Sequence, residues 1–221
     1  MHTGPFPCII GVMGRARSGK DTFAVTAQKA FQQLHDMNYD VARLAAPLKR
    51  AVMALYDFSH DQVEGAAKEE YDRRWGIRPR DAMVRLTQDT MNFVGHDFFS
   101  RRLWGAWDRG AFPRPIIVPD VRYAHDIQWI HERGGLVVKV ARRLGNDVPH
   151  HDAENGIDEL VGDVFFENNG SIDEFKNAIV AWAQSFGLEA KANDSKRYGV
   201  TCPAPPPTPV VNARDTASGP L

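Results

Sequence analysis

The stretch Gly14-Arg15-Ala16-Arg17-Ser18-Gly19-Lys20-Asp21-Thr22 directly follows the apolar run CIIGVM at residues 8–13. A buried strand that ends in G-x-x-x-x-G-K and opens into a helix is the P-loop arrangement. Its glycines let successive backbone N–H groups point at phosphate oxygens, and the start of the helix adds the positive end of its dipole. A lysine at position 20 would reach the β- and γ-phosphates. The sequence therefore predicts a nucleotide phosphate site over residues 14–22.

One position departs from the general motif. The residue after the lysine is normally Ser or Thr, whose hydroxyl binds Mg²⁺, but here Asp21 follows Lys20 and Thr22 comes next. A carboxylate can ligate Mg²⁺ directly or through water. We therefore expect Asp21 and Thr22 to be the metal-binding residues.

Length and composition narrow the class of protein. A chain of 221 residues indicates one domain, and a hydrophobic content of 43% is enough for a packed core. The formal net charge of −1 argues against a general nucleic-acid-binding surface. No apolar run approaches the roughly 18 residues of a membrane span, so we expect a cytoplasmic protein without membrane contact. The composition leaves open whether the chain forms a homodimer.

The order of elements predicts an α/β fold with a mainly parallel sheet, because apolar strand patterns alternate with helical ones. Strands are expected at 8–13, 41–45, 115–119, 136–140 and 163–167, and helices at 20–37, 79–94, 124–133 and 171–186. The helical pattern from about 48 to 110 predicts an insertion over the carboxyl edge of the sheet, where such sheets bind ligands. One domain would span 1–188. Residues 189–221 hold six of the fourteen prolines and are expected to be a disordered tail.

A second chemical signal follows the apolar run at 116–118. Asp120 is placed where a P-loop protein can hold Mg²⁺ or its water shell, and Arg122 can neutralise a phosphate through a bidentate contact. An exposed, salt-bridged turn could contain the same letters. The position behind a strand in a chain with a P-loop favours the functional interpretation.

Basic residues are dense in the central block, and many of them belong on solvated helix faces. Lys49, behind Pro47 at a strand-to-helix turn, and Arg80, behind Pro79 at a helix start, are best placed to bind phosphate. Arg142 and Arg143 follow a strand end and suit a lid over the transferring phosphate, with surface charge as the alternative. The turn around His151 and Glu154 lacks the spacing of a zinc site and indicates a polar substrate-binding turn.

Several segments together resemble the phage-type deoxynucleoside monophosphate kinases. The loop at 14–22 is similar to the family's G-x-x-R-S-G-K-D-T, in which aspartate after the lysine is usual. Residues 46–49 resemble its A-x-P-L-K turn, 79–88 its P-R-x-x-L-Q stretch, and 118–123 its D-V-R-F/Y element. Residues 134–140 and 168–171 match its G-G-x-V-x-x-V and N-x-G-[ST] segments, and 151–154 its H-x-S-E motif with alanine for serine.

This resemblance implies a P-loop kinase-like three-layer sandwich that uses ATP and Mg²⁺ to phosphorylate (deoxy)nucleoside monophosphates in the cytoplasm, the host's if the chain is phage-encoded. Lys20, Asp120 and Arg122 would be catalytic. The ATP-binding residues would be Gly14, Arg17, Ser18, Gly19, Lys20, Asp21, Thr22, Arg142 and Arg143. The substrate-binding residues would be Ala16, Pro47, Lys49, Lys68, Arg80, Gln88, Arg122, Tyr123, His151 and Glu154.

Two alternatives stay open at this point. The G-x-x-x-S-G-K-D loop also occurs in phosphomevalonate kinases, so the acceptor could be another small phosphate monoester. The chain could also be an accessory protein that binds ATP without transferring phosphate and recruits a partner through its proline-rich tail. Asp89-Thr90 stands where the family has a glycine–threonine pair, and Ala153 precedes Glu154, so the contacts to the substrate base differ most from the family pattern.

Overall fold

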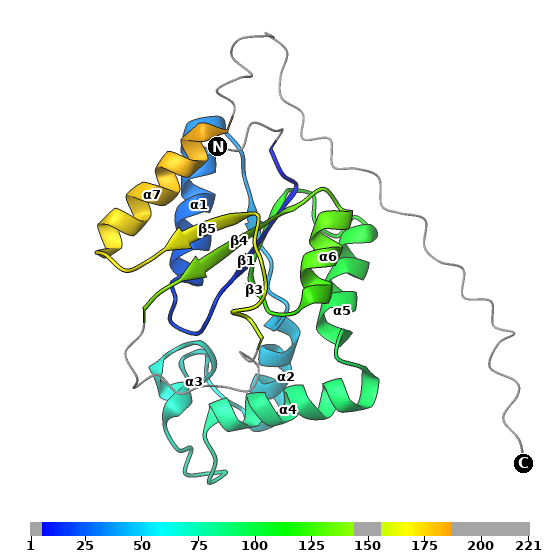
Figure 1. Cartoon of the computed structure of the whole chain (residues 1–221). Coiled ribbons are helices and arrows are strands. Elements are labelled where there is room, and N and C mark those ends of the chain that lie inside the picture. Colours follow the sequence, from blue (N-terminus) through cyan, green and yellow to red (C-terminus); the bar gives the residue numbers. More distant parts are fainter. Residues whose placement is uncertain (1–5, 144–155, 187–221) are drawn as a thin grey trace, which may run out of the picture.

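In the computed structural model, which describes residues 6–143 and 156–186, five parallel strands form one sheet in the order β2-β3-β1-β4-β5 (Figure 1). The strands are β1 Ile9–Met13, β2 Asp40–Val41, β3 Ile116–Val121, β4 Leu136–Ala141 and β5 Val164–Glu167. The central strand β1 is buried along its whole length. Strands buried on both faces read as continuous apolar runs, which is why the patterns at 8–13 and 115–119 could be identified.

Helices cover both faces of the sheet and make three layers (Figure 1). On one face, α1 (Lys20–His35) and α7 (Ile172–Ser185) pack Phe23, Phe31 and Ile179 onto Ile10 and Val138. The other face is covered by α5 (Phe98–Asp108) and α6 (Ala124–Glu132). The architecture confirms the predicted α/β fold with a parallel sheet. None of the helices within the described ranges is long and apolar enough to cross a membrane.

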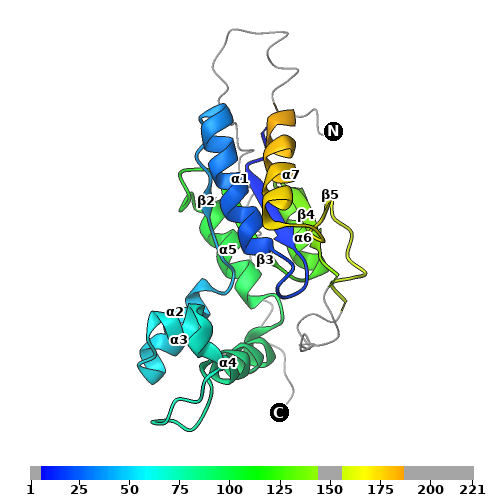
Figure 2. The ribbon, with the colours of Figure 1, turned by 90° about the vertical axis from the view of Figure 1, so that its left-hand side faces the viewer.

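The remaining helices form an insertion between β2 and β3. They are α2 (Ala46–Tyr56), α3 (His60–Glu64), the 3₁₀ helix η1 (Ala66–Glu69) and α4 (Pro79–Val94). α2, α3 and α4 enclose a small core of their own, formed by Val52, Phe58, Val63 and Ala82. Two perpendicular views place this insertion beyond the edge of the sheet at which the P-loop lies (Figures 1 and 2). The predicted tail lies outside the described residues, and the domain boundaries stay a prediction.

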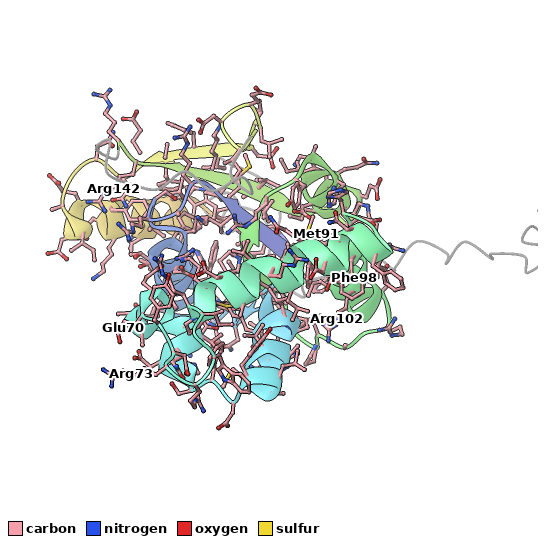
Figure 3. The ribbon with its side chains drawn as sticks, turned by 90° about the horizontal axis from the view of Figure 1, so that it is seen from below. Glu70, Arg73, Met91, Phe98, Arg102 and Arg142 are labelled. Atoms are coloured by element: carbon pink, nitrogen blue, oxygen red, sulfur yellow. The ribbon has the colours of Figure 1, made fainter. Side chains whose placement is uncertain are left out.

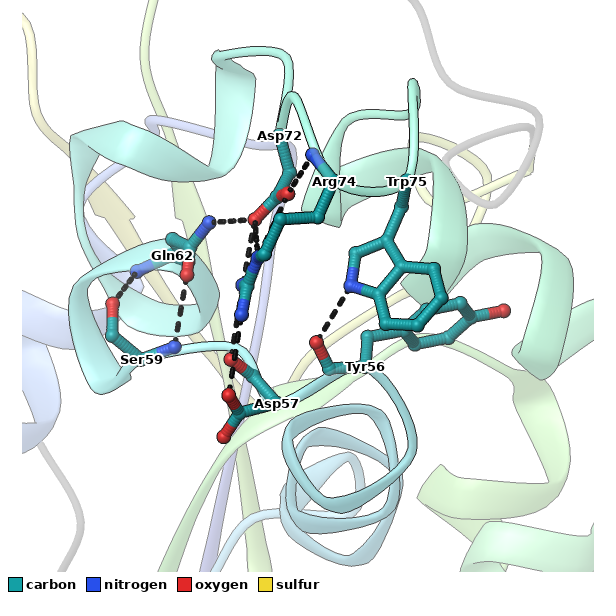
Figure 4. A network of polar contacts seen from close by, with 7 residues as sticks. All are labelled: Tyr56, Asp57, Ser59, Gln62, Asp72, Arg74 and Trp75. Carbon is teal, nitrogen blue, oxygen red and sulfur yellow. Dashed lines mark hydrogen bonds and ion pairs between the residues drawn. The ribbon is translucent and has the colours of Figure 1, made fainter.

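The loop between η1 and α4 is tied to α2 and α3 by a polar network (Figure 4). The buried carboxylate of Asp72 accepts hydrogen bonds from Gln62 Nε2 and from the backbone N–H of Arg74, both at 2.8 Å. The Arg74 guanidinium bridges Asp72 and Asp57. Hydrogen bonds from Arg74 and then Gln62 hold the pKa of Asp72 well below its usual range. The network therefore stabilises the insertion when Asp72 is ionised.

The second strand is shorter than expected, because β2 ends at Val41 and not near residue 45. The backbone N–H groups of Leu44 and Ala45 donate to the two carboxylate oxygens of Asp120, each at 3.0 Å, and not to a neighbouring strand. Asp120 itself lies within β3, which continues to Val121, whereas the sequence pattern placed it behind the strand. Here the Asp120 side chain takes the place of a neighbouring strand as the hydrogen-bond acceptor. A pattern of apolar residues cannot indicate such a contact.

Candidate functional site

The loop between β1 and α1 has the strand–loop–helix form of a P-loop. Gly14 has a φ of 151° and Gly19 a φ of 107°, and residues other than glycine rarely adopt such positive φ angles. A Cβ on Gly14 would lie 2.2 Å from the carbonyl oxygen of Val140. The chain can therefore turn tightly against β4 because these two positions are glycine.

Lys20 is the first residue of α1, and its side chain turns back over the loop. The ammonium group donates hydrogen bonds to the carbonyl oxygens of Gly14 and Arg15, each at 2.7 Å. This geometry places a positive charge above the loop, next to the N-terminus of the helix. Both features favour an anion at this end of α1.

A cavity of about 310 Å³ adjoins this loop. It brings together six residues that the sequence assigned to ATP binding, namely Arg17, Gly19, Lys20, Asp21, Thr22 and Arg142. The opposite wall comes from the turn between β5 and α7 and from α7 itself, with Asn168, Gly170, Ile172 and Phe175. Arg142 lies beside α7 in the view from below (Figure 3). Ser18, also assigned to ATP binding, is buried within the loop, and Ala16, which was assigned to substrate binding, is partly exposed there.

Arg143 is placed differently from its neighbour Arg142. Its side chain is exposed and does not line the cavity, while its backbone N–H donates to Asn169 Oδ1 at 2.7 Å. Of the predicted pair of arginines, the structure brings Arg142 to the P-loop and leaves Arg143 beside the site.

The first turn of α1 offers oxygen atoms suited to Mg²⁺. Asp21 and Thr22 both line the cavity beside Lys20, and the Asp21 side chain is 73% exposed. Carboxylate and hydroxyl oxygens are ligands that Mg²⁺ accepts together with water and substrate phosphates. Within the described ranges, no group of three or more His, Cys, Asp or Glu side chains forms a metal cluster. The donor set therefore fits a metal that is shared with a nucleotide.

Asp120 and Arg122 lie at the end of β3, next to the P-loop strand. The Asp120 carboxylate lies beneath the loop after β2, and this burial raises its pKa, while hydrogen bonds from Ala45 and Leu44 oppose the rise. Both carboxylate oxygens are thus engaged in holding that loop. The side chain of Arg122, half-buried, makes no hydrogen bond or ion pair with any residue that the structure describes.

The turn that carries Arg122 is held by a residue that the motif analysis did not assign. Asp126, fully buried at the start of α6, accepts hydrogen bonds from the backbone N–H groups of Arg122 and Tyr123, both at 3.0 Å. It also accepts one from the hydroxyl of Ser100 on α5. Asp126 therefore joins the turn of Arg122 to α5.

The predicted substrate residues of the insertion are spread over its helices. Lys49 on α2 forms an ion pair with Glu64, and Arg80 on α4 with Glu69. Pro47 lies in the first turn of α2, Lys68 is partly exposed on η1, and Gln88 is exposed on α4. The Tyr123 ring stacks on His125 with 5.2 Å between ring centroids. His151 and Glu154 lie outside the described residues.

Three residues near the site were missed by sequence reasoning. Arg43, behind β2, pairs with Asp21, with 2.7 Å between Nη1 and Oδ1. Asp126 could have been found as an acid in the first turn of a helix, a usual position for a residue that binds free N–H groups. Asn168 belongs to the N-x-G-S stretch, which was matched but received no role. Nothing local in the sequence marks Arg43.

The parallel sheet, the glycine loop and the lysine at the start of α1 define a P-loop kinase-like α/β protein. Residues 109–179 match the family model for deoxynucleotide monophosphate kinase. The chain is also 27% identical over 191 residues to a putative deoxynucleotide monophosphate kinase of Acanthamoeba polyphaga mimivirus, and the match covers 78% of this chain and 94% of the viral protein. The comparisons thus show that the chain is similar to deoxynucleotide monophosphate kinases.

Proposed function

We propose that this protein transfers the γ-phosphoryl group of ATP to a deoxynucleoside monophosphate and forms the diphosphate. The observation that carries this proposal is the register of two neighbouring strands. Met13 at the end of β1 is paired with Val121 at the end of β3. The P-loop follows directly after Met13 and Arg122 directly after Val121, and neighbouring strands lie about 4.8 Å apart. A donor-phosphate loop and an acceptor-side arginine therefore leave the sheet side by side.

For phosphoryl transfer the protein mainly has to align the two substrates and neutralise the charge of their phosphates. Phosphoryl transfer passes through a loose transition state, so alignment and neutralisation of charge supply most of the catalysis. Lys20 and the loop N–H groups would hold the ATP phosphates, and Arg142 would close over them from the β4 side. Asp21 and Thr22 would hold Mg²⁺, which when bound supplies positive charge for the β- and γ-phosphates.

The acceptor would lie between the end of β3 and the insertion. Arg122 would hold the acceptor phosphate. Asp120 holds the neighbouring loop after β2 through the N–H groups of Leu44 and Ala45. Lys49 and Arg80 would add positive charge from α2 and α4. Each pairs with a glutamate of the same insertion, Glu64 or Glu69, and would give up this partner to bind the phosphate. Lys68, Gln88 and Tyr123, with His151 and Glu154, remain candidates for contacts to the nucleoside.

The test is ADP formation from ATP and Mg²⁺ with a panel of deoxynucleoside and nucleoside monophosphates. Lys20→Ala should lower kcat by at least about a thousandfold, because oxyanion-type stabilisation by one group is worth about 2.7–4 kcal/mol and Lys20 also positions the donor. Lys29→Ala, an exposed lysine on the same helix, is the matched control and should leave turnover unchanged. Turnover that persists in Lys20→Ala would overturn the role of the loop. If the protein phosphorylates none of the nucleotides but does phosphorylate another phosphate monoester, the proposed acceptor is wrong.

A further inference from the structure

The turn after β5 touches the P-loop from behind. Asn168 follows the last residue of β5, and its side-chain Nδ2 donates a hydrogen bond to the carbonyl oxygen of Ser18 at 2.8 Å. Both residues are buried, Asn168 to 7% and Ser18 to 1% exposure. A buried hydrogen bond between residues 150 positions apart in the chain is a tertiary feature of the site and not a local turn.

Hydrogen bonds fix the backbone on both sides of Asn168. Its backbone N–H donates to the carbonyl oxygen of Ala141 at 2.8 Å, which extends the pairing of β4 with β5 by one step. Three residues further on, Ser171 and Glu174 close a capping box at the start of α7. The amide is therefore held from the sheet on one side and from a capped helix on the other.

The hydrogen bond acts on a peptide group that would bind phosphate. In a trans peptide the C=O and the following N–H point in opposite directions. The Ser18 carbonyl points at Asn168, so the N–H of Gly19 points away from it. Asn168 and the Phe175 ring also pack closely against Gly19, since a Cβ built there would lie 2.5 Å from Asn168 Nδ2 and 3.1 Å from the Phe175 ring. Asn168 thereby sets the direction of one N–H group of the P-loop.

We propose that Asn168 is a positioning residue for the donor phosphates, which acts by holding the Ser18–Gly19 peptide with its Gly19 N–H turned away from the β5–α7 turn. This inference rests on the proposed role of the P-loop in binding ATP. It assigns a function to the side-chain N–H₂ of Asn168, which donates to the loop and does not have to touch the substrate. The effect is expected on donor affinity and on kcat, with little effect on binding of the monophosphate.

The test is Asn168→Asp, which keeps the shape of the side chain and replaces the donor by an oxygen that faces the Ser18 carbonyl. Asn177→Asp makes the same change in charge on the exposed side of α7 and is the matched control. Calorimetry would measure binding of ATP and of inorganic tripolyphosphate, which probes the loop without the nucleoside. We expect both affinities to fall at least about tenfold in Asn168→Asp, as for loss of a buried hydrogen bond. Affinity for a deoxynucleoside monophosphate and both affinities of Asn177→Asp should stay within twofold.

The pH dependence distinguishes positioning from a general loss of structure. A protonated carboxylic acid can again donate to the Ser18 carbonyl, so the deficit of Asn168→Asp relative to the natural protein should shrink as the pH is lowered. If the aspartate variant does not fold, Asn168→Ala, which removes the donor without adding charge, carries the same expectation for tripolyphosphate. Natural affinity for ATP and tripolyphosphate in the folded variant, or an equal loss of donor and acceptor binding, would overturn the inference. Absence of ATP binding in the natural protein would instead overturn the proposed function.

Discussion

The carboxylate of Asp21 and the guanidinium of Arg43 form an ion pair, with 2.7 Å between Oδ1 and Nη1. The pair joins the first turn of α1 to the loop behind β2, which Asp120 holds by the N–H groups of Leu44 and Ala45. The Asp21 side chain is 73% exposed and that of Arg43 32%, so the pair contributes little to stability. Its importance lies in its position, because the proposed metal ligand already has a cation beside it.

Removal of that cation should make metal binding easier. Two unit charges about 4 Å apart in water interact by about 1 kcal/mol, which corresponds to about fivefold in affinity. In Arg43→Gln we expect the Mg²⁺ concentration that half-saturates ATP binding to fall by up to about fivefold, as measured by calorimetry without an acceptor. Arg50→Gln, an exposed arginine on α2, is the control. If Arg43→Gln needs as much Mg²⁺ as the natural protein, or more, Asp21 is not a ligand of the metal.

Asp126 should matter for the acceptor more than for ATP. In Asp126→Ala both acceptor oxygens are lost, so the backbone N–H groups of Arg122 and Tyr123 lose their partner, at a cost of about 1–3 kcal/mol in the free energy of unfolding for each group that stays unpaired. The turn that carries Arg122 loosens as a result. We expect the KM for the monophosphate to rise more than the KM for ATP, as measured by steady-state kinetics with each substrate varied.

The control for this prediction is Ser100→Ala. It removes the hydroxyl on α5 and leaves the two backbone hydrogen bonds of Asp126 to Arg122 and Tyr123 in place. Its effect on the KM for the monophosphate should therefore be smaller than that of Asp126→Ala. Equal changes in both KM values of Asp126→Ala would show that Asp126 stabilises the fold without positioning Arg122.

The network around Asp72 predicts a dependence of stability on pH. Its partners Arg74 and Gln62 lower the pKa of Asp72 below the ordinary value of 3.8. The folded protein therefore favours the ionised carboxylate more than the unfolded chain does, and this contribution is present above pH 3.8 and is lost as the pH falls towards the folded pKa. Asp72→Asn should be less stable than the natural protein near neutral pH, and the difference should narrow below about pH 4.

Thermal unfolding over a pH series would measure this difference, and amide hydrogen exchange of residues 70–78 would locate it in the insertion. Asp89→Asn removes an exposed ion pair with Arg85 one helical turn away and should show almost no difference at any pH. A constant gap between Asp72→Asn and the natural protein from neutral to acid pH would contradict the prediction.

Local patterns were enough for most elements of this fold, although not for the ends of β2 and β3. The helix predicted at 79–94 begins and ends where the structure has it, because a proline suits the first turn and the apolar spacing continues to Val94. The strand–loop–helix at the P-loop follows from glycines that allow positive φ angles, a property of single residues. The parallel sheet followed from the alternation of strands and helices. Each of these features depends on residues that are close together in the chain.

The contacts that hold the site could not be read in this way. Asp21 meets Arg43, Asp120 meets Leu44 and Ala45, and Asn168 meets Ser18, because strands β2, β3, β1, β4 and β5 lie side by side in that order. Apolar periodicity says that a strand exists but not which strand is its neighbour. The sequence by itself thus determined a P-loop and the type of fold, and the tertiary structure alone decided which side chains support that loop and the turn of Arg122, since strand order sets which strand ends meet.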